Sequence, residues 1–124
     1  MTIIKLVKTK EVLVPFLQQK LSPKLSYKIM KFVSKIETEE TFYNVRLKDI
    51  IDKYGAKDAN GKLITTDTGI QIEESQQEEC KNALAELDAV EVEAPDIKFS
   101  LDELGEIKLS AIDMYMLSDF ITED

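Results

Sequence analysis

Residues 22–55 read SPKLSYKIMKFVSKIETEETFYNVRLKDIIDKYG. Serine followed by proline marks a helix start, because the serine side chain caps free amides and proline has no N–H that needs a partner. No helix breaker follows before Gly55, and apolar residues recur in steps of three and four, as on one face of an amphipathic helix. These residues are Leu25, Ile29, Phe32, Ile36, Tyr43, Leu47, Ile50 and Tyr54. The sequence therefore predicts one helix over residues 23–54, with Gly55 as its left-handed C-terminal residue.

This helix is long for a chain of 124 residues. At 1.5 Å per residue it extends about 48 Å, whereas a return helix of about 13 residues covers about 20 Å of it. The remaining apolar face is covered by other helices of the chain or by a second copy, and the sequence leaves both alternatives open. A homodimer is therefore one possible assembly.

The residues before the long helix predict a strand and a shorter helix. Residues 2–7 (TIIKLV) are apolar and β-branched, which favours a short strand. Thr9 is in position to cap a helix over residues 10–20. Pro15 lies inside that helix, and because it lacks an N–H we expect it to bend or split the element.

Turn-forming residues follow Gly55 and separate two short strands, residues 62–65 and 70–73, which we expect to form a hairpin. Ser75 and Glu78 have the spacing of a capping box, which predicts a return helix over residues 76–88. The following residues 89–93 alternate apolar and acidic side chains. Together with residues 97–99 they predict a second antiparallel pair of strands.

Two further capping signals complete the chain. Ser100 with Glu103 predicts a single helical turn that ends at Gly105, and Ser110 with Asp113 predicts a final helix over residues 111–121. The predicted fold is therefore α+β, a single domain over residues 1–124. It consists of a long helical hairpin with short antiparallel strand pairs and a short C-terminal helix.

Composition excludes several classes of function. The chain has no histidine and one cysteine, Cys80, which excludes an internal disulfide, Ser-His-Asp and Cys-His catalysis, and zinc sites with histidine ligands. There is no run of about 18 apolar residues and no secretory signal pattern, so we expect no membrane contact and a cytosolic location. Cys80 lies at an apolar position of its predicted helix, which indicates a buried, unreactive thiol.

The remaining candidates for chemistry are also weak. The loop that begins Asp58-Ala-Asn60-Gly61 alternates oxygen ligands, but its glycine comes too early for an EF-hand, so a hairpin turn is favoured over a calcium site. Carboxylates are abundant without the spacing of a catalytic pair. We therefore predict no catalytic residue, no cofactor and no metal site. A remote alternative is a carboxylate enzyme that depends on a metal ion.

Charge is divided unevenly along the chain, whose net charge is −8. Thirteen of the 16 Lys and Arg residues lie in the first 64 residues, and 17 of the 24 Asp and Glu residues lie in the last 60. Either the two halves pack on each other, or the acidic half is a surface for a basic partner. In the second case the acidic surface repels DNA itself. A basic stripe on the long helix is a solvated face, a surface that receives the acidic half, or a weak contact for phosphate: Lys20, Lys24, Lys28, Lys31 and Lys35.

An acidic ridge is the candidate surface for a partner. It runs from the return helix into the alternating segment and consists of Glu86, Asp88, Glu91, Glu93 and Asp96. Such a ridge can mimic the phosphates of a nucleic acid and so occupy the groove of an enzyme that binds nucleic acid.

Several motifs carry a family resemblance. They are Lys53-Tyr-Gly55 before the hairpin, Val90-Glu-Val92, Leu101-Asp-Glu-Leu104 and Leu117-Ser-Asp-Phe-Ile121. From about residue 20 onward the chain resembles a group of small acidic phage and prophage proteins of unknown function. The resemblance implies a non-catalytic accessory or assembly role in the cytoplasm of a bacterial host, through binding to a phage or host protein. The alternative is an inhibitor of a host defence enzyme.

Overall fold

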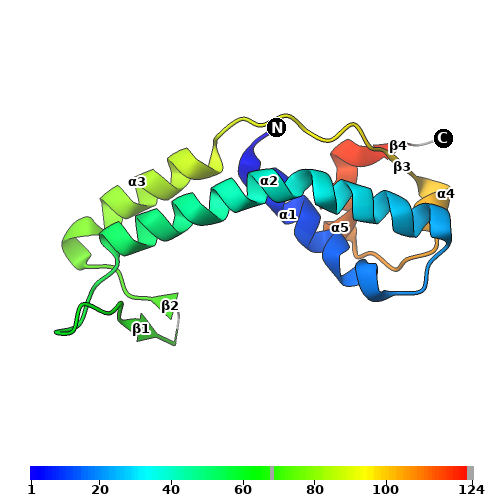
Figure 1. Ribbon diagram of the computed structural model, residues 1–124. Helices are drawn as coiled ribbons and strands as arrows, with labels where there is room; N and C mark the ends of the chain where they lie inside the picture. Colours follow the sequence, from blue (N-terminus) through cyan, green and yellow to red (C-terminus); the bar gives the residue numbers. More distant parts are fainter. Residues whose placement is uncertain (68, 123–124) are drawn as a thin grey trace.

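Helix α2 (Pro23–Tyr54) forms the axis of the computed structural model, which describes residues 1–67 and 69–122. Figure 1 shows α3 lying along one half of α2, the β1–β2 hairpin below the end of that half, α1 crossing α2 near its middle, and α4 and α5 near the other half. The fold is α+β and mostly helical, as the sequence predicted, and a long helical hairpin dominates it.

Both ends of α2 lie at the predicted residues. The Ser22 hydroxyl accepts a hydrogen bond from the backbone N–H of Leu25 at 3.4 Å, and Pro23 occupies the first turn. The prediction for Gly55 is wrong in its conformation, because its φ of −67° is extended and not left-handed. Glycine is required there for space: a Cβ would lie 2.5 Å from Leu63 Cδ2 and 2.6 Å from the carbonyl oxygen of Ile51.

The N-terminal residues form helix α1 (Ile3–Leu13), so the predicted strand over residues 2–7 is wrong. The Thr2 side chain caps this helix by accepting a hydrogen bond from the N–H of Lys5. A short apolar run suits either a strand or a buried helix. Burial against α2 decides in favour of the helix, because Ile3, Leu6 and Leu13 are completely buried.

The predicted helix over residues 10–20 is also corrected. Thr9 is not its cap but lies inside α1, fully buried, where its hydroxyl donates to the Lys5 carbonyl at 2.7 Å. Beyond Leu13 the chain continues as a 3₁₀ helix, η1 (Val14–Gln18), which has Pro15 in its first turn. The expected split at Pro15 is thus confirmed.

A hairpin follows α2 at the predicted place, with shorter strands. Strands β1 (Thr65–Thr66) and β2 (Gly69–Ile70) pair antiparallel, with Thr65 opposite Ile70. Isolated antiparallel bridges join Lys57 to Leu63 and Gly55 to Ile72. The hairpin is therefore tied to the end of α2.

The return helix α3 (Gln77–Asp88) confirms the predicted helical hairpin, but its start differs. A 3₁₀ turn, η2 (Glu74–Gln76), precedes it and contains Ser75. No side chain caps α3, so the predicted capping box of Ser75 and Glu78 is wrong. The turn itself changes the direction of the chain before α3 begins.

The predicted antiparallel pairing of residues 89–93 with 97–99 is wrong. The first segment instead lies beside the N-terminal residues, since the N–H of Ile3 donates to the Val90 carbonyl at 2.8 Å and Thr2 is bridged to Glu91. Strand β3 (Phe99–Ser100) pairs in parallel with β4 (Ile121–Thr122). Alternation identifies an extended segment but not its partner.

Both late capping boxes are confirmed. Ser100 and Glu103 cap the single turn α4 (Leu101–Leu104), and Ser110 and Asp113 cap α5 (Ala111–Leu117). The final helix is shorter than predicted because a 3₁₀ turn, η3 (Ser118–Phe120), leads directly into β4.

The chain covers the apolar face of α2 with its own segments. Phe32 of α2 contacts Phe99 and Phe120, with ring centroids 5.8 and 4.8 Å apart, in a cluster that also contains Leu6 and Leu117. Along the other half, Tyr43 packs with Ile3, Val7 and Leu87. Of the two alternatives left open by the sequence, cover from within the chain accounts for the buried residues of this face.

Candidate functional site

Helix α3 combines one face that packs on the rest of the chain with one that is exposed. It packs on α2 and α1 through one face, where Cys80 and Leu87 are 5% and 6% exposed. Its opposite face is open to solvent. Apolar side chains nevertheless line a groove on each side of the helix, so we treat α3 and these two grooves as the candidate site.

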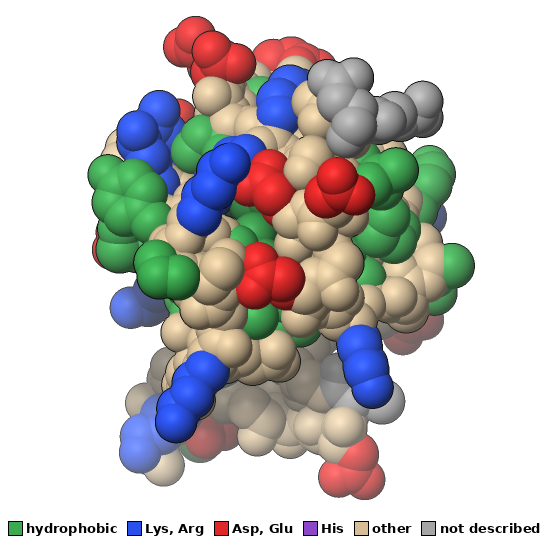
Figure 2. Space-filling model, turned by 90° about the vertical axis from the view of Figure 1, so that its right-hand side faces the viewer, with side chains coloured by type: hydrophobic (Ala, Val, Ile, Leu, Met, Phe, Trp, Pro, Cys, Tyr) green, Lys and Arg blue, Asp and Glu red, His purple; other side chains and the backbone are tan. Residues whose placement is uncertain are grey.

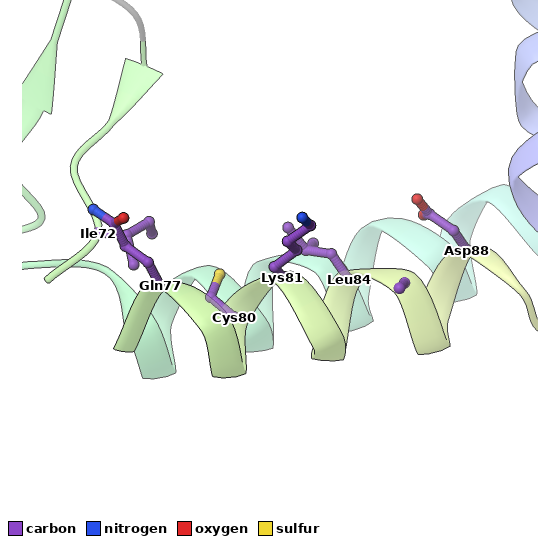
Figure 3. A pocket seen from close by; sticks show the side chains of 7 residues that line it. Ile72, Gln77, Cys80, Lys81, Leu84 and Asp88 are labelled. Carbon is purple, nitrogen blue, oxygen red and sulfur yellow. The ribbon is translucent and has the colours of Figure 1, made fainter. Parts of the chain in front are cut away.

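The first groove, here called the Cys80 groove, has a volume of about 430 Å³. Its lining is apolar at Ile72, Cys80, Leu84 and Ala85 and polar at Gln77, Lys81 and Asp88. Figure 3 shows the labelled side chains of α3 on the same side of the helix, with the hairpin at one end and Asp88 toward the other. The burial predicted for Cys80 is confirmed by its low exposure, and its predicted lack of reactivity stays a prediction. Cys80 is also one of the residues that line the groove.

The second groove lies between α3 and α2 and is called the Phe42 groove. Its volume is about 420 Å³. Phe42 and the neighbouring Val45 are 42% and 54% exposed, although both are large apolar residues. Arg46 lies over the Phe42 ring at 5.6 Å, and Glu86 lines the wall formed by α3. This groove is apolar in its centre with charges at its rim, which is the usual make-up of a protein contact surface.

The five residues of the predicted acidic ridge occupy different surroundings. Glu86 lines the Phe42 groove, while Glu93 and Asp96 line a polar hollow of about 350 Å³ together with Lys35. Asp88 and Glu91 are engaged within the chain: Asp88 accepts a hydrogen bond from Tyr43, and Glu91 lies 2.9 Å from the Met1 amino group. Three of the five carboxylates thus have no ion pair or hydrogen bond within residues 1–67 and 69–122.

The pair of Tyr43 and Asp88 ties α2 to α3 under the edge of the Cys80 groove. The Tyr43 hydroxyl donates to Asp88 Oδ1 at 2.7 Å. Burial of Tyr43, reinforced by this hydrogen bond to a carboxylate, raises the pKa of the phenol to about 12. Asp88 therefore stabilises the packing of α3 on α2 and also lines the Cys80 groove.

The basic and acidic halves of the chain do pack on each other. Lys5 pairs with Asp119, and Lys28 lies 2.8 Å from Glu103, so both pairs join the two halves. The Lys28 hydrogen bond, with a second from the Ser100 backbone, holds the pKa of Glu103 below its usual range. Figure 2 shows positive, negative and hydrophobic side chains interspersed at the end of the molecule that carries α4 and α5.

The glutamates at α3 form no such ion pairs in the described residues, although Glu73 lines a polar hollow together with Lys53 and Lys57. Five exposed glutamates lie in the residues that lead into α3 and on the helix itself: Glu73, Glu74, Glu78, Glu79 and Glu86. No ion pair involves any of them in the part of the chain that the structure describes, and the only basic residue of α3 is Lys81. Helix α3 and the turn before it therefore carry an excess of negative charge.

The predicted site residues did not include the apolar side chains that are exposed on α2 and α5. Phe42 and Val45 lie outside the apolar stripe of α2, and Ile112 and Tyr115 on α5 are each 74% exposed. Ile112 also lines a hollow of about 330 Å³ between α1 and α5. Departure from the stripe is the signal that identifies Phe42 and Val45 in the sequence, because a soluble helix normally carries polar residues there.

The described residues give little support to a calcium site, another metal site or a membrane-spanning helix. Asp58 accepts hydrogen bonds from the backbone N–H groups of Asn60 and Lys62, which is the geometry of a turn. Residues 1–67 and 69–122 contain no group of three or more metal-ligating side chains placed to hold an ion. None of the helices in these ranges is both long enough and apolar enough to cross a membrane.

Comparison of the chain with protein-family models, with curated proteins and with solved structures finds no match in any of the three. The surface of α3 and the residues around it are therefore the observations that bear on function.

Proposed function

We propose that this chain is a non-catalytic accessory protein that acts by binding another protein through α3 and its two grooves. The observation that supports this proposal is the pair of apolar grooves, each more than 400 Å³ in volume, on either side of one helix. Apolar surface exposed in this way is typical of contact sites between proteins.

The negative charge around α3 adds a preference for a basic partner. Complementary charge at the rim of an interface speeds association and excludes partners of the same sign, while apolar contacts in the centre supply most of the affinity. Nucleic acid is not a partner on this proposal, because its phosphates would face the glutamates of α3.

The resemblance to phage and prophage proteins also suggests where this binding takes place. The partner would be a phage or host protein in the cytoplasm of a bacterial cell, in an assembly or host-interaction role. Mimicry of nucleic acid is the second candidate, and the unpaired carboxylates of Glu86, Glu93 and Asp96 favour it. It is the weaker candidate because Asp88 and Glu91, the other two residues of the ridge, are engaged within the chain.

The experiment that tests the proposal compares two classes of variant for retention of a partner from a bacterial lysate. Phe42→Ser with Val45→Ser removes apolar surface from the Phe42 groove and from the exposed side of α2 one turn away, and Tyr27→Ser with Met30→Ser is the matched control, since those two residues are also exposed on α2. We expect the first double variant to lose a protein that the wild type and the control retain. Equal retention by all three would contradict the proposal.

The effect of ionic strength on partner binding distinguishes the two candidate functions. A partner held by apolar contacts stays bound as ionic strength rises, and Glu93→Lys with Asp96→Lys changes mainly its association rate. A target of nucleic-acid mimicry would be released by moderate salt and by the same double variant. Surface plasmon resonance with the identified partner distinguishes these outcomes.

A further inference from the structure

Complete burial is confined to one part of the molecule. Every described side chain that is 0–1% exposed belongs to residues 3–36 or 99–120, around the aromatic core formed by Phe32, Phe99 and Phe120. In residues 37–67 and 69–96, by contrast, no side chain is less than 5% exposed. Buried apolar area supplies most of the free energy that keeps a segment folded. The segments packed on the second half of α2 are therefore held less strongly than the core.

Helix α3 is attached to α2 by few interactions. Two of its side chains, Cys80 and Leu87, are buried. Within the described residues, the bond from Tyr43 to Asp88 is the only side-chain hydrogen bond between the two helices, and no ion pair joins them. A helix of 12 residues is marginally stable in water by itself, so α3 depends on these contacts.

The chain on either side of α3 is fixed by backbone hydrogen bonds. Before the helix, the N–H of Ala56 donates to the Gln71 carbonyl at 2.8 Å, which ties the hairpin to the end of α2. After the helix, the Val90 carbonyl accepts from the N–H of Ile3 at 2.8 Å. Helix α3 spans the distance between these two anchors along α2 (Figure 1). It is therefore a strap, with both ends fixed and its middle held mainly by apolar contacts.

We propose that the α3 strap undocks from α2 as one unit while the aromatic core stays folded. A segment with few buried contacts opens at a lower free energy than the whole protein. Undocking exposes Cys80 and Leu87, together with Leu47 and Ile50 of α2, which pack near Leu87. This inference goes beyond the proposed function, because it concerns the isolated chain and needs no partner.

Undocking also separates the walls of the Phe42 groove. Phe42 and Ile50 of α2 line one wall, and Ala83 and Leu87 of α3 line the other. The groove therefore exists only while the strap is docked. Opening of α3 thus removes one of the two candidate binding surfaces.

Cys80, the only cysteine of the chain, reports undocking without a mutation. The rate at which a thiol reagent modifies it, divided by the rate for a short peptide that contains cysteine, gives the fraction of molecules with an exposed thiol. Urea denaturation gives the globally unfolded fraction. We expect the first fraction to exceed the second at least about 100-fold and to depend less steeply on urea.

Two results of this comparison would overturn the proposal. Equal fractions with the same dependence on urea would show that the thiol is exposed only by global unfolding. Modification as fast as that of the peptide would show that α3 is not docked on α2 at all.

Matched variants identify the contact that holds the strap. Tyr43→Phe removes the hydrogen bond to Asp88, and Tyr27→Phe is the control, because Tyr27 lies on the same helix and is 61% exposed. We expect Tyr43→Phe to speed modification of Cys80 about fivefold and Tyr27→Phe to change it less than about twofold. Equal rates in the two variants would mean that the reagent reaches the thiol while α3 stays in place, which overturns the proposal.

Hydrogen exchange tests whether the aromatic core stays folded when the strap opens. In the wild type, the backbone amides of α3 should exchange with a lower opening free energy than those of residues 29–36. Leu117→Ala in the core should speed exchange of residues 29–36 and leave the rate of Cys80 modification within about twofold of the wild type. The wild-type comparison is decisive even if Leu117→Ala does not fold. Equal opening free energies for the two segments would show that the chain opens as a single unit, and the proposal would be wrong.

Discussion

At the scale of single residues, the hydrogen bond from Tyr43 to Asp88 gives the joint between α2 and α3 a dependence on pH. Burial and the neighbouring carboxylate favour the neutral phenol and raise its pKa to about 12. Because an unfolded tyrosine has a pKa of about 10, this pair contributes stability that is complete below about pH 10 and lost as pH rises toward 12.

We predict that a spectroscopic titration of tyrosinate shows one tyrosine with a pKa near 12 in the wild type. Tyr43→Phe should remove that component, and Asp88→Asn should lower its pKa because the negative neighbour is gone. Superimposable titration curves for the wild type and Asp88→Asn would show that the carboxylate has no part in the shift.

Gly55 leads to a second prediction at this scale. Its missing side chain makes room for Leu63 and for the Ile51 carbonyl, which would lie 2.5 and 2.6 Å from a Cβ. Gly55→Ala should therefore lower the free energy of unfolding by about 1–3 kcal/mol, measured by urea denaturation. Gly61→Asn is the control, because no atom lies within 4 Å of that site and asparagine tolerates its φ of 80°. A loss at Gly61 as large as that at Gly55 would argue against crowding as the cause.

At the scale of elements, Phe32 of α2 joins segments that are far apart in the chain. Its ring is completely buried between Phe99 of β3 and Phe120 of η3. Phe32→Ala should cost about 3–5 kcal/mol of unfolding free energy, since it leaves a cavity among aromatic rings. Phe42→Ala on the same helix should cost about 1 kcal/mol or less, because Phe42 is 42% exposed. Equal losses in chemical denaturation would mean that the aromatic cluster does not stabilise the fold.

At the scale of the whole molecule, the buried face of α2 determines the expected assembly. The stripe from Leu25 to Tyr54 suggested a second copy, but the chain itself buries its residues from Leu25 to Ile36 and also Tyr43 and Tyr54. We therefore predict that light scattering of the isolated protein reports the monomer mass of 14.1 kDa. A mass of about twice that value would mean that the grooves beside α3, or the exposed Ile112 and Tyr115, pair two copies.

Local chemistry in the sequence predicted the elements whose ends are set by nearby residues. Ser22 and Pro23 marked the start of α2, Gly55 marked its end, and the boxes at Ser100 and Ser110 marked α4 and α5. Each of these signals acts over a few residues through backbone hydrogen bonds, so it can be recognised without knowledge of the rest of the fold.

The elements and site residues that the sequence mispredicted depend on distant partners. Residues 2–7 form a helix because α2 buries their apolar side chains, and the segment at Val90 pairs with the N-terminal residues and not with its neighbour in sequence. The acidic ridge is divided because Tyr43 engages Asp88 across the helical hairpin. Burial, strand pairing and hydrogen bonds between distant residues depend on how helices pack, and short-range patterns in the sequence do not contain that information.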